Sequence, residues 1–155
     1  MKTIDTWLEE YGESHKNPTN KLVHWVCVPV IFWTVVALLW SVKLPVELAP
    51  GLALNAAMIA VALVFIYYVT LSVKLSLGLL LFTAACLYIS WFVETHVSFP
   101  LWAIALIAFV LAWVGQFWGH KVEGKKPSFL KDLQFLMIGP AWLMSFIYQR
   151  LGIKY

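Results

Sequence analysis

Residues 22–42 read LVHWVCVPVIFWTVVALLWSV, a run of 21 residues between Lys21 and Lys43 that contains no Asp, Glu, Lys or Arg. A helix needs about 20 mostly apolar residues to cross a bilayer. The whole chain of 155 residues is 62% hydrophobic and 12% charged, whereas soluble domains carry roughly 25% charged residues. We therefore predict an all-α fold, a polytopic membrane helix bundle that forms one integral-membrane domain over residues 1–155.

The spacing of charged residues outlines three further spans. The uncharged gaps that begin after Glu47, Lys74 and Glu94 are 26, 19 and 26 residues long, so each is long enough to cross a bilayer. The four predicted transmembrane helices lie near 22–42, 51–72, 75–93 and 100–119.

A fifth apolar stretch, residues 133–149, has a different character. It is 17 residues long and carries Gly139-Pro140 near its middle. Proline removes a backbone donor and clashes with the preceding helical turn. We predict a C-terminal re-entrant or interfacial helical hairpin here, with a fifth span as the alternative.

Lysine placement predicts the orientation of the bundle. In a four-span arrangement only Lys43 lies on one face. The opposite face holds Lys2, Lys16, Lys21, Lys74, Lys121, Lys125, Lys126 and Lys131. Because Lys and Arg accumulate on the cytoplasmic side, we expect that face to be cytoplasmic, in a bacterial inner membrane rather than the endoplasmic reticulum. The lysines mark topology, and we expect no nucleic-acid partner.

The predicted topology sorts the four histidines. His15, His24 and His120 fall on the cytoplasmic face, whereas His96 lies between the third and fourth spans. About 30 Å of hydrocarbon separates the two faces. We therefore exclude His96 from any site shared with the other three.

The first polar cluster surrounds the start of the first span. Asn17-Pro18 predicts a helix start, because Asn caps free amides and Pro is tolerated in the first turn. Asn20 and His24 are four residues apart and share a helix face. His15 precedes the cap, where the chain can fold back over the site. An ionisable residue inside a span, such as His24, indicates function.

The second polar cluster ends the fourth span. Gln116, His120 and Glu123 are spaced four and three residues apart, so they line one helix face. Gly115 and Gly119 form a pair of small residues that lets another helix approach closely. We expect this pair to bring His120 against the first span.

Together the clusters suggest a metal site. Imidazole nitrogen and carboxylate oxygen suit a divalent ion such as iron, zinc or manganese. Gln116 or Asn20 would fix the tautomer of a ligating histidine. The candidate metal ligands and catalytic residues are His15, His24, His120 and Glu123.

The two clusters also carry a family resemblance. Residues 11–29 contain H-x-N-P-x-N-x-x-x-H and residues 113–127 contain Q-F-x-G-H-x-x-E-G-x-x-P. Over essentially the whole chain, the sequence resembles the 2-hydroxy fatty acid dioxygenase family, which includes a fungal phytosphingosine-metabolism protein and bacterial relatives.

The resemblance implies an Fe(II)-dependent dioxygenase in contact with membrane lipid. It would combine a 2-hydroxy fatty acid with dioxygen and release a fatty acid one carbon shorter, an α-oxidation. Carried over by position, the implied iron ligands are His15, His24 and His120. Glu123 is a further candidate iron ligand. Candidates for the second shell or for substrate are Asn17, Asn20, Gln116, Lys121, Lys125 and Lys126, the lysines as attractants for the substrate carboxylate.

Two other functions are compatible with the same residues. One is a zinc-dependent hydrolase acting on a membrane lipid, since zinc accepts the same ligand types. The other is a non-enzymatic metal-binding or structural membrane protein. Iron in anaerobically purified protein would favour the dioxygenase, zinc the hydrolase, and no metal the structural protein.

Overall fold

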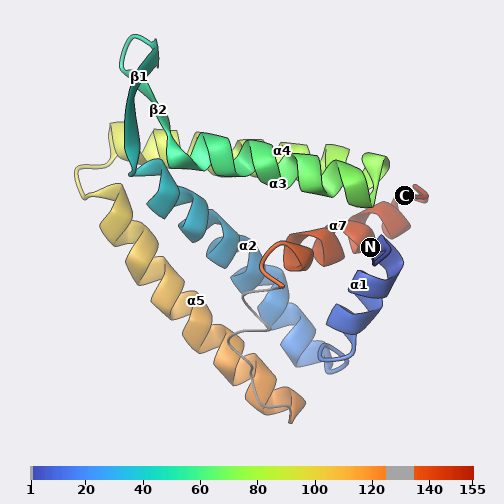
Figure 1. Cartoon of the computed structure of the whole chain (residues 1–155). Coiled ribbons are helices and arrows are strands. Elements are labelled where there is room, and N and C mark those ends of the chain that lie inside the picture. The colour runs from blue at the N-terminus through green and yellow to red at the C-terminus, as the bar shows by residue number, and fades with distance from the viewer. Residues whose placement is uncertain (1, 125–134) are drawn as a thin grey trace.

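The computed structural model describes residues 2–124 and 135–155. In this part of the chain it contains six helices and one two-stranded sheet (Figure 1). The elements are α1 (Ile4–Gly12), α2 (Pro18–Trp40), β1 (Lys43–Ala49), β2 (Leu52–Asn55), α3 (Ala56–Leu71), α4 (Val73–His96), α5 (Leu101–Glu123) and α7 (Ile138–Arg150).

Helices α2 and α5 run side by side in opposite directions and form the most extensive helix–helix contact of the fold (Figure 1). Two glycines of α5 allow this approach. A Cβ added at Gly115 would lie 2.8 Å from Cys27 Sγ, and one at Gly119 would lie 2.5 Å from Asn20 Oδ1. Ordinary carbon contacts are about 3.5–4.0 Å. The predicted close packing of another helix against the glycine pair is therefore confirmed.

Three of the predicted spans correspond to long apolar helices. Helices α2, α4 and α5 have 23, 24 and 23 residues and are long and apolar enough to cross a membrane. Their outward faces are apolar too: Leu81 of α4 is 74% exposed and Leu111 of α5 is 66% exposed. Apolar faces of this extent are compatible with a lipid environment.

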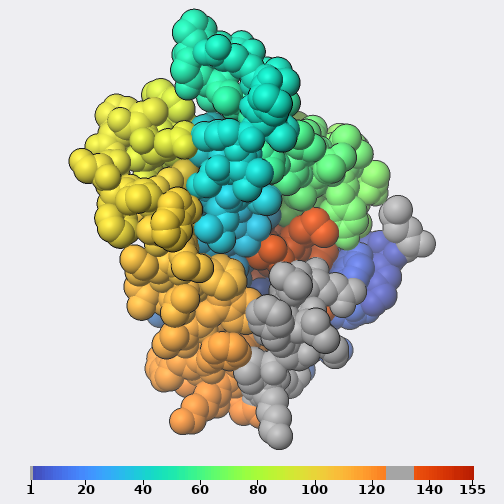
Figure 2. Space-filling model, turned by 60° about the vertical axis from the view of Figure 1, so that its left-hand side comes forward, coloured from blue at the N-terminus to red at the C-terminus, as the bar shows by residue number. Residues whose placement is uncertain are grey.

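The predicted second span, 51–72, is wrong at its first boundary, because β1 and β2 form an antiparallel hairpin that was not expected in an all-α fold. Pro50 and Gly51 turn the chain, and Gly51 has the positive φ of 76° that a type II turn requires. The hairpin projects beyond the helices (Figure 2). Helix α3 then begins at Ala56 with Asn55 as its cap, and its 16 residues are fewer than a full span needs.

The C-terminal stretch also differs from its prediction. Gly139-Pro140 does not interrupt a helix at its middle but lies in the first turn of α7, where the missing proline N–H costs no intrahelical bond. Helix α7 has 13 residues, roughly 20 Å at 1.5 Å per residue, which is too short for a fifth span. Residues 133–134 lie outside the described part of the chain.

Helix α7 joins the ends of several elements. The Tyr148 hydroxyl donates to the Lys74 carbonyl at 2.8 Å, and the Tyr68 hydroxyl donates to the Met137 carbonyl at 2.7 Å. Trp142 of α7 packs with Tyr11 in a buried apolar cluster. The N-terminal helix, the α3–α4 turn and α7 thus lie at the same end of the molecule, as the predicted topology requires.

Candidate metal centre

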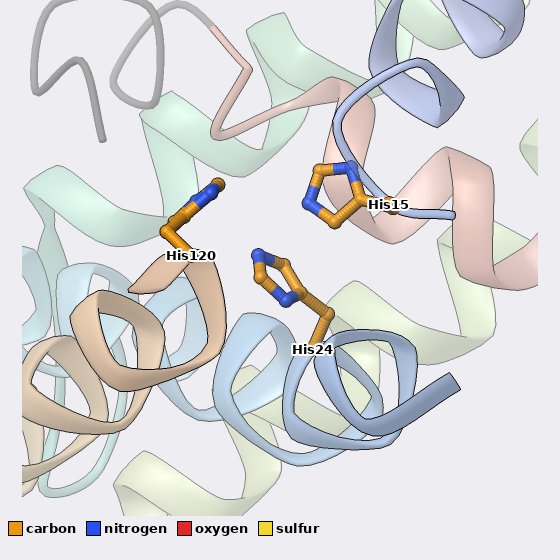
Figure 3. Close-up of side chains that lie close together, drawn as sticks. All are labelled: His15, His24 and His120. Carbon is orange, nitrogen blue, oxygen red and sulfur yellow. The ribbon is translucent and has the colours of Figure 1, made fainter. Parts of the chain in front are cut away.

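Three buried histidines meet at the end of the α2–α5 pair. His15 comes from the link between α1 and α2, His24 from α2, and His120 from the last turn of α5. They are 4%, 1% and 4% exposed, and one ring nitrogen from each lies within 4.8 Å of the others. Their rings point toward one another (Figure 3). Among the described residues, these three histidines form the one group of His, Cys, Asp or Glu side chains whose ligand atoms lie close enough together to hold a metal ion.

Backbone carbonyls fix the tautomer of two of these histidines. His24 Nδ1–H donates to the Asn20 carbonyl at 2.9 Å, and His15 Nδ1–H donates to the Tyr11 carbonyl. Because a carbonyl only accepts, Nδ1 carries the proton in both rings and Nε2 keeps its lone pair for a metal. Asn20 was expected to fix the tautomer of a histidine, and its backbone carbonyl is the partner of His24 Nδ1. The Gln116 side chain interacts with His24 from α5.

Glu123 lies beside the triad, but its carboxylate binds other groups. It accepts hydrogen bonds from the backbone N–H of Lys16 at 3.0 Å, from the backbone N–H of Asn17 at 2.9 Å and from Asn20 Nδ2 at 3.1 Å. The group suited to a metal contains the three histidines without this glutamate. The carboxylate therefore links chain segments around the triad.

Two of the remaining candidates, Asn17 and Lys121, lie less buried than the triad. Asn17 is the N-cap of α2, as predicted, and its side chain accepts from the Thr19 N–H at 2.9 Å. Lys121 is exposed on the last turn of α5. Lys125 and Lys126 lie outside the described residues.

Two aromatic residues of the site were missed in the sequence. The Tyr11 ring stacks on His15 with centroids 4.3 Å apart and an interplanar angle of 7°. The centroid of the Trp142 ring lies 5.2 Å from that of His15. Tyr11 is four residues before His15, the spacing that also joins Asn20 to His24, so this interval was a usable indication. Nothing local points to Trp142, which reaches the site only through the docking of α7.

His96 is excluded from the site, as its place between two spans predicts. It ends α4, next to the start of α5, whereas His120 lies near the opposite end of α5. Its ring is exposed, stacks on Phe92 with centroids 4.3 Å apart, and hydrogen-bonds to the Thr95 hydroxyl at 2.7 Å. His96 is therefore an exposed histidine with local partners.

The donor set of the triad fits a divalent transition metal. Metal–imidazole bonds are roughly 2.0–2.1 Å long, so two nitrogen ligands of one ion lie about 3–4 Å apart. The observed limit of 4.8 Å exceeds this by roughly 1 Å, a distance that small ring rotations cover. Three neutral imidazoles would leave further coordination positions open for small ligands.

One comparison with known proteins identifies a family for this chain. The family model described as 2-hydroxy-palmitic acid dioxygenase Mpo1-like matches residues 1–151. No curated protein and no solved structure gives a significant match to the chain. Since the match covers nearly all 155 residues, the chain belongs to the Mpo1-like family, the family described as 2-hydroxy-palmitic acid dioxygenase Mpo1-like.

Proposed function

We propose that this protein is a membrane-embedded, Fe(II)-dependent dioxygenase that converts 2-hydroxy fatty acids to fatty acids one carbon shorter. The observation that carries the proposal is the buried triad of His15, His24 and His120, in which one ring nitrogen from each residue lies within 4.8 Å of the other two. Family membership supplies the expected reaction class.

The proposed iron ligands are the three histidines. Bound Fe(II) would supply the activation of dioxygen that oxidation at C2 of the substrate requires. We leave Glu123 outside the ligand set, since its carboxylate already accepts three N–H donors. The open positions suit a 2-hydroxy acid, which chelates a metal through its carboxylate and its hydroxyl.

The protein's own residues would bind the substrate from the membrane side. Lys121, together with Lys125 and Lys126, would attract the carboxylate at the interface, and the acyl chain would lie along the apolar helix faces. We further propose that α3 completes a four-helix membrane domain and that the triad lies at its cytoplasmic face. The lysine distribution supports this orientation.

The test is an assay of purified full-length protein with 2-hydroxypalmitate. The expected product is the C15 acid, formed only with Fe(II) and oxygen. His24→Ala and His120→Ala should each abolish activity and reduce bound iron. His96→Ala is the matched control and should retain both. Full activity in either triad variant would overturn the proposal, as would failure of iron-loaded protein to turn over the acid.

A further inference from the structure

Glu123 joins two parts of the site that are distant in sequence, the end of α5 and residues 16–20. Its donors Lys16, Asn17 and Asn20 lie 107, 106 and 103 residues away along the chain. Glu123 ends α5, Lys16 and Asn17 belong to the link before α2, and Asn20 lies in the first turn of α2. Hydrogen bonds to a carboxylate are stronger than those between neutral groups. One side chain therefore ties the end of α5 to the start of α2.

Asn20 extends this connection to the segment that carries His15. Its side chain is fully buried, and Nδ2 donates both to Glu123 Oε2 at 3.1 Å and to the Ser14 carbonyl at 3.0 Å. Its carbonyl accepts the His24 Nδ1–H at 2.9 Å. Asn20 thus contacts the residue before His15, orients His24 and binds the helix end that carries His120.

We propose that Glu123 and Asn20 are positioning residues of the metal centre, and that Glu123 is not a fourth ligand. Their network, defined by Glu123, Asn20 and the N–H groups of Lys16 and Asn17, holds His15 across the ends of α2 and α5. The proposal rests on the metal binding assigned to the triad under the proposed function.

The hydrogen-bond network requires a fixed donor or acceptor role at each position, which metal coordination by Glu123 would not require. Glu123 acts as acceptor only and Asn20 Nδ2 as donor only. Asn20→Asp places a second carboxylate against Glu123, while Glu123→Gln replaces one acceptor oxygen with a donor. In the double variant the amide introduced at position 123 can donate to the carboxylate introduced at position 20. One donor–acceptor pair is then restored with the roles reversed.

The experiment titrates Co(II) into the detergent-purified full chain and follows affinity and the visible d–d spectrum. Substituting a residue that hydrogen-bonds to a metal ligand typically weakens metal affinity about 10–100-fold. We expect Asn20→Asp to weaken Co(II) binding by about that factor, Glu123→Gln to weaken it by about tenfold, and the double variant to bind more tightly than Asn20→Asp alone. Both single variants should keep the wild-type spectrum at saturation, whereas His24→Ala should change it.

Glu94→Gln is the matched control. Glu94 also accepts two hydrogen bonds, from Trp40 Nε1 at 2.7 Å and from Lys43 Nζ at 2.8 Å, but it does so at the opposite end of the bundle. This variant should bind Co(II) like the wild type. Circular dichroism of each variant separates misfolding from a changed site, and Glu123→Gln carries the test if Asn20→Asp does not fold.

The possible outcomes distinguish the roles of Glu123. A spectral change in Glu123→Gln like that of His24→Ala would make Glu123 a ligand and overturn the proposal. Wild-type affinity in both single variants, or a double variant no better than Asn20→Asp, would overturn it too. Because Co(II) binding is independent of turnover, wild-type protein that binds Co(II) in this way but leaves 2-hydroxypalmitate unchanged refutes the proposed reaction and retains the positioning roles. Wild-type protein that binds no Co(II) refutes both.

Discussion

Replacing Gly119 with alanine tests whether close packing of α2 on α5 builds the metal centre. The added Cβ would lie 2.5 Å from Asn20 Oδ1 and 3.2 Å from Val23 Cγ1. The Asn20 side chain has little freedom to withdraw, because it is fully buried and its Nδ2 is held by Ser14 and Glu123. Restoring an ordinary contact of about 3.5 Å therefore requires the two helices to separate by roughly 1 Å.

That displacement acts on stability and on the site at once. Overpacking a well-packed interface costs about 1–3 kcal/mol, which lowers the melting temperature of the protein. Gly119 precedes His120, and Asn20 orients His24, so two of the three rings move with the helices. We expect Gly119→Ala to weaken Co(II) binding about 10–100-fold, the range typical of disturbed outer-shell contacts. The assays are Co(II) titration and thermal denaturation in detergent.

Gly12→Ala is the matched control for this substitution. A Cβ at Gly12 would have Trp142 Nε1 as its nearest neighbour at 3.6 Å, an ordinary contact, and Gly12 lies in helix α1. Alanine there should leave Co(II) affinity unchanged. Wild-type melting temperature and affinity in Gly119→Ala would refute the reasoning, since they would show that the interface yields without moving the histidines.

Three further outcomes follow from the packing and the topology. Gly115→Ala should lower the melting temperature, because the new Cβ would lie 2.8 Å from Cys27 Sγ, its one close neighbour among the described residues. Adding Cys27→Ala should restore the melting temperature, and no recovery would contradict this packing argument. Gly51→Ala should cost about 1–2 kcal/mol from its positive φ of 76° yet leave Co(II) affinity unchanged, and weaker binding would contradict the separation of hairpin and site. In sealed membrane vesicles a tag at Lys2 and a tag inserted after Gly51 should be cleaved by protease from opposite sides, and cleavage from one side would refute the proposed orientation.

The parts of the site that obey local rules were predictable from sequence. Asn17-Pro18 specifies a helix start by capping and by the fixed φ of proline, and α2 begins at Pro18. The small residues Gly115 and Gly119 indicate a close helix contact, and α2 supplies it. These local features place His24 and His120 on facing helices, which is why two motifs distant in the sequence could be assigned to one site.

The parts that depend on long-range docking were not predictable in this way. Residues 51–55 are apolar enough to have been included in the predicted second span. Pro45 and Pro50 oppose a helix in this region, and antiparallel pairing with β1 satisfies the backbone instead. Trp142 contacts His15 because α7 packs on α1, α2 and α4. No spacing within 138–150 encodes that arrangement. The hydrogen-bond partners of Glu123 were likewise hidden, since its spacing of three residues from His120 says nothing of the donors that it meets near the start of α2.

The depth of the triad bears on the kind of ligand that reaches it. His24 lies six residues after Pro18, about 9 Å along the axis of α2 at 1.5 Å per residue, and His120 lies in the last turn of α5. The triad is therefore near the helix ends rather than at the middle of the bundle. A charged group at mid-membrane depth costs about 2.5–3.5 kcal/mol or more, whereas near the interface a carboxylate keeps part of its hydration while an attached acyl chain remains in lipid. On the orientation proposed above, this position is compatible with the proposed long-chain acid, because its carboxylate would enter near the interface while its acyl chain stays beside the apolar helix faces.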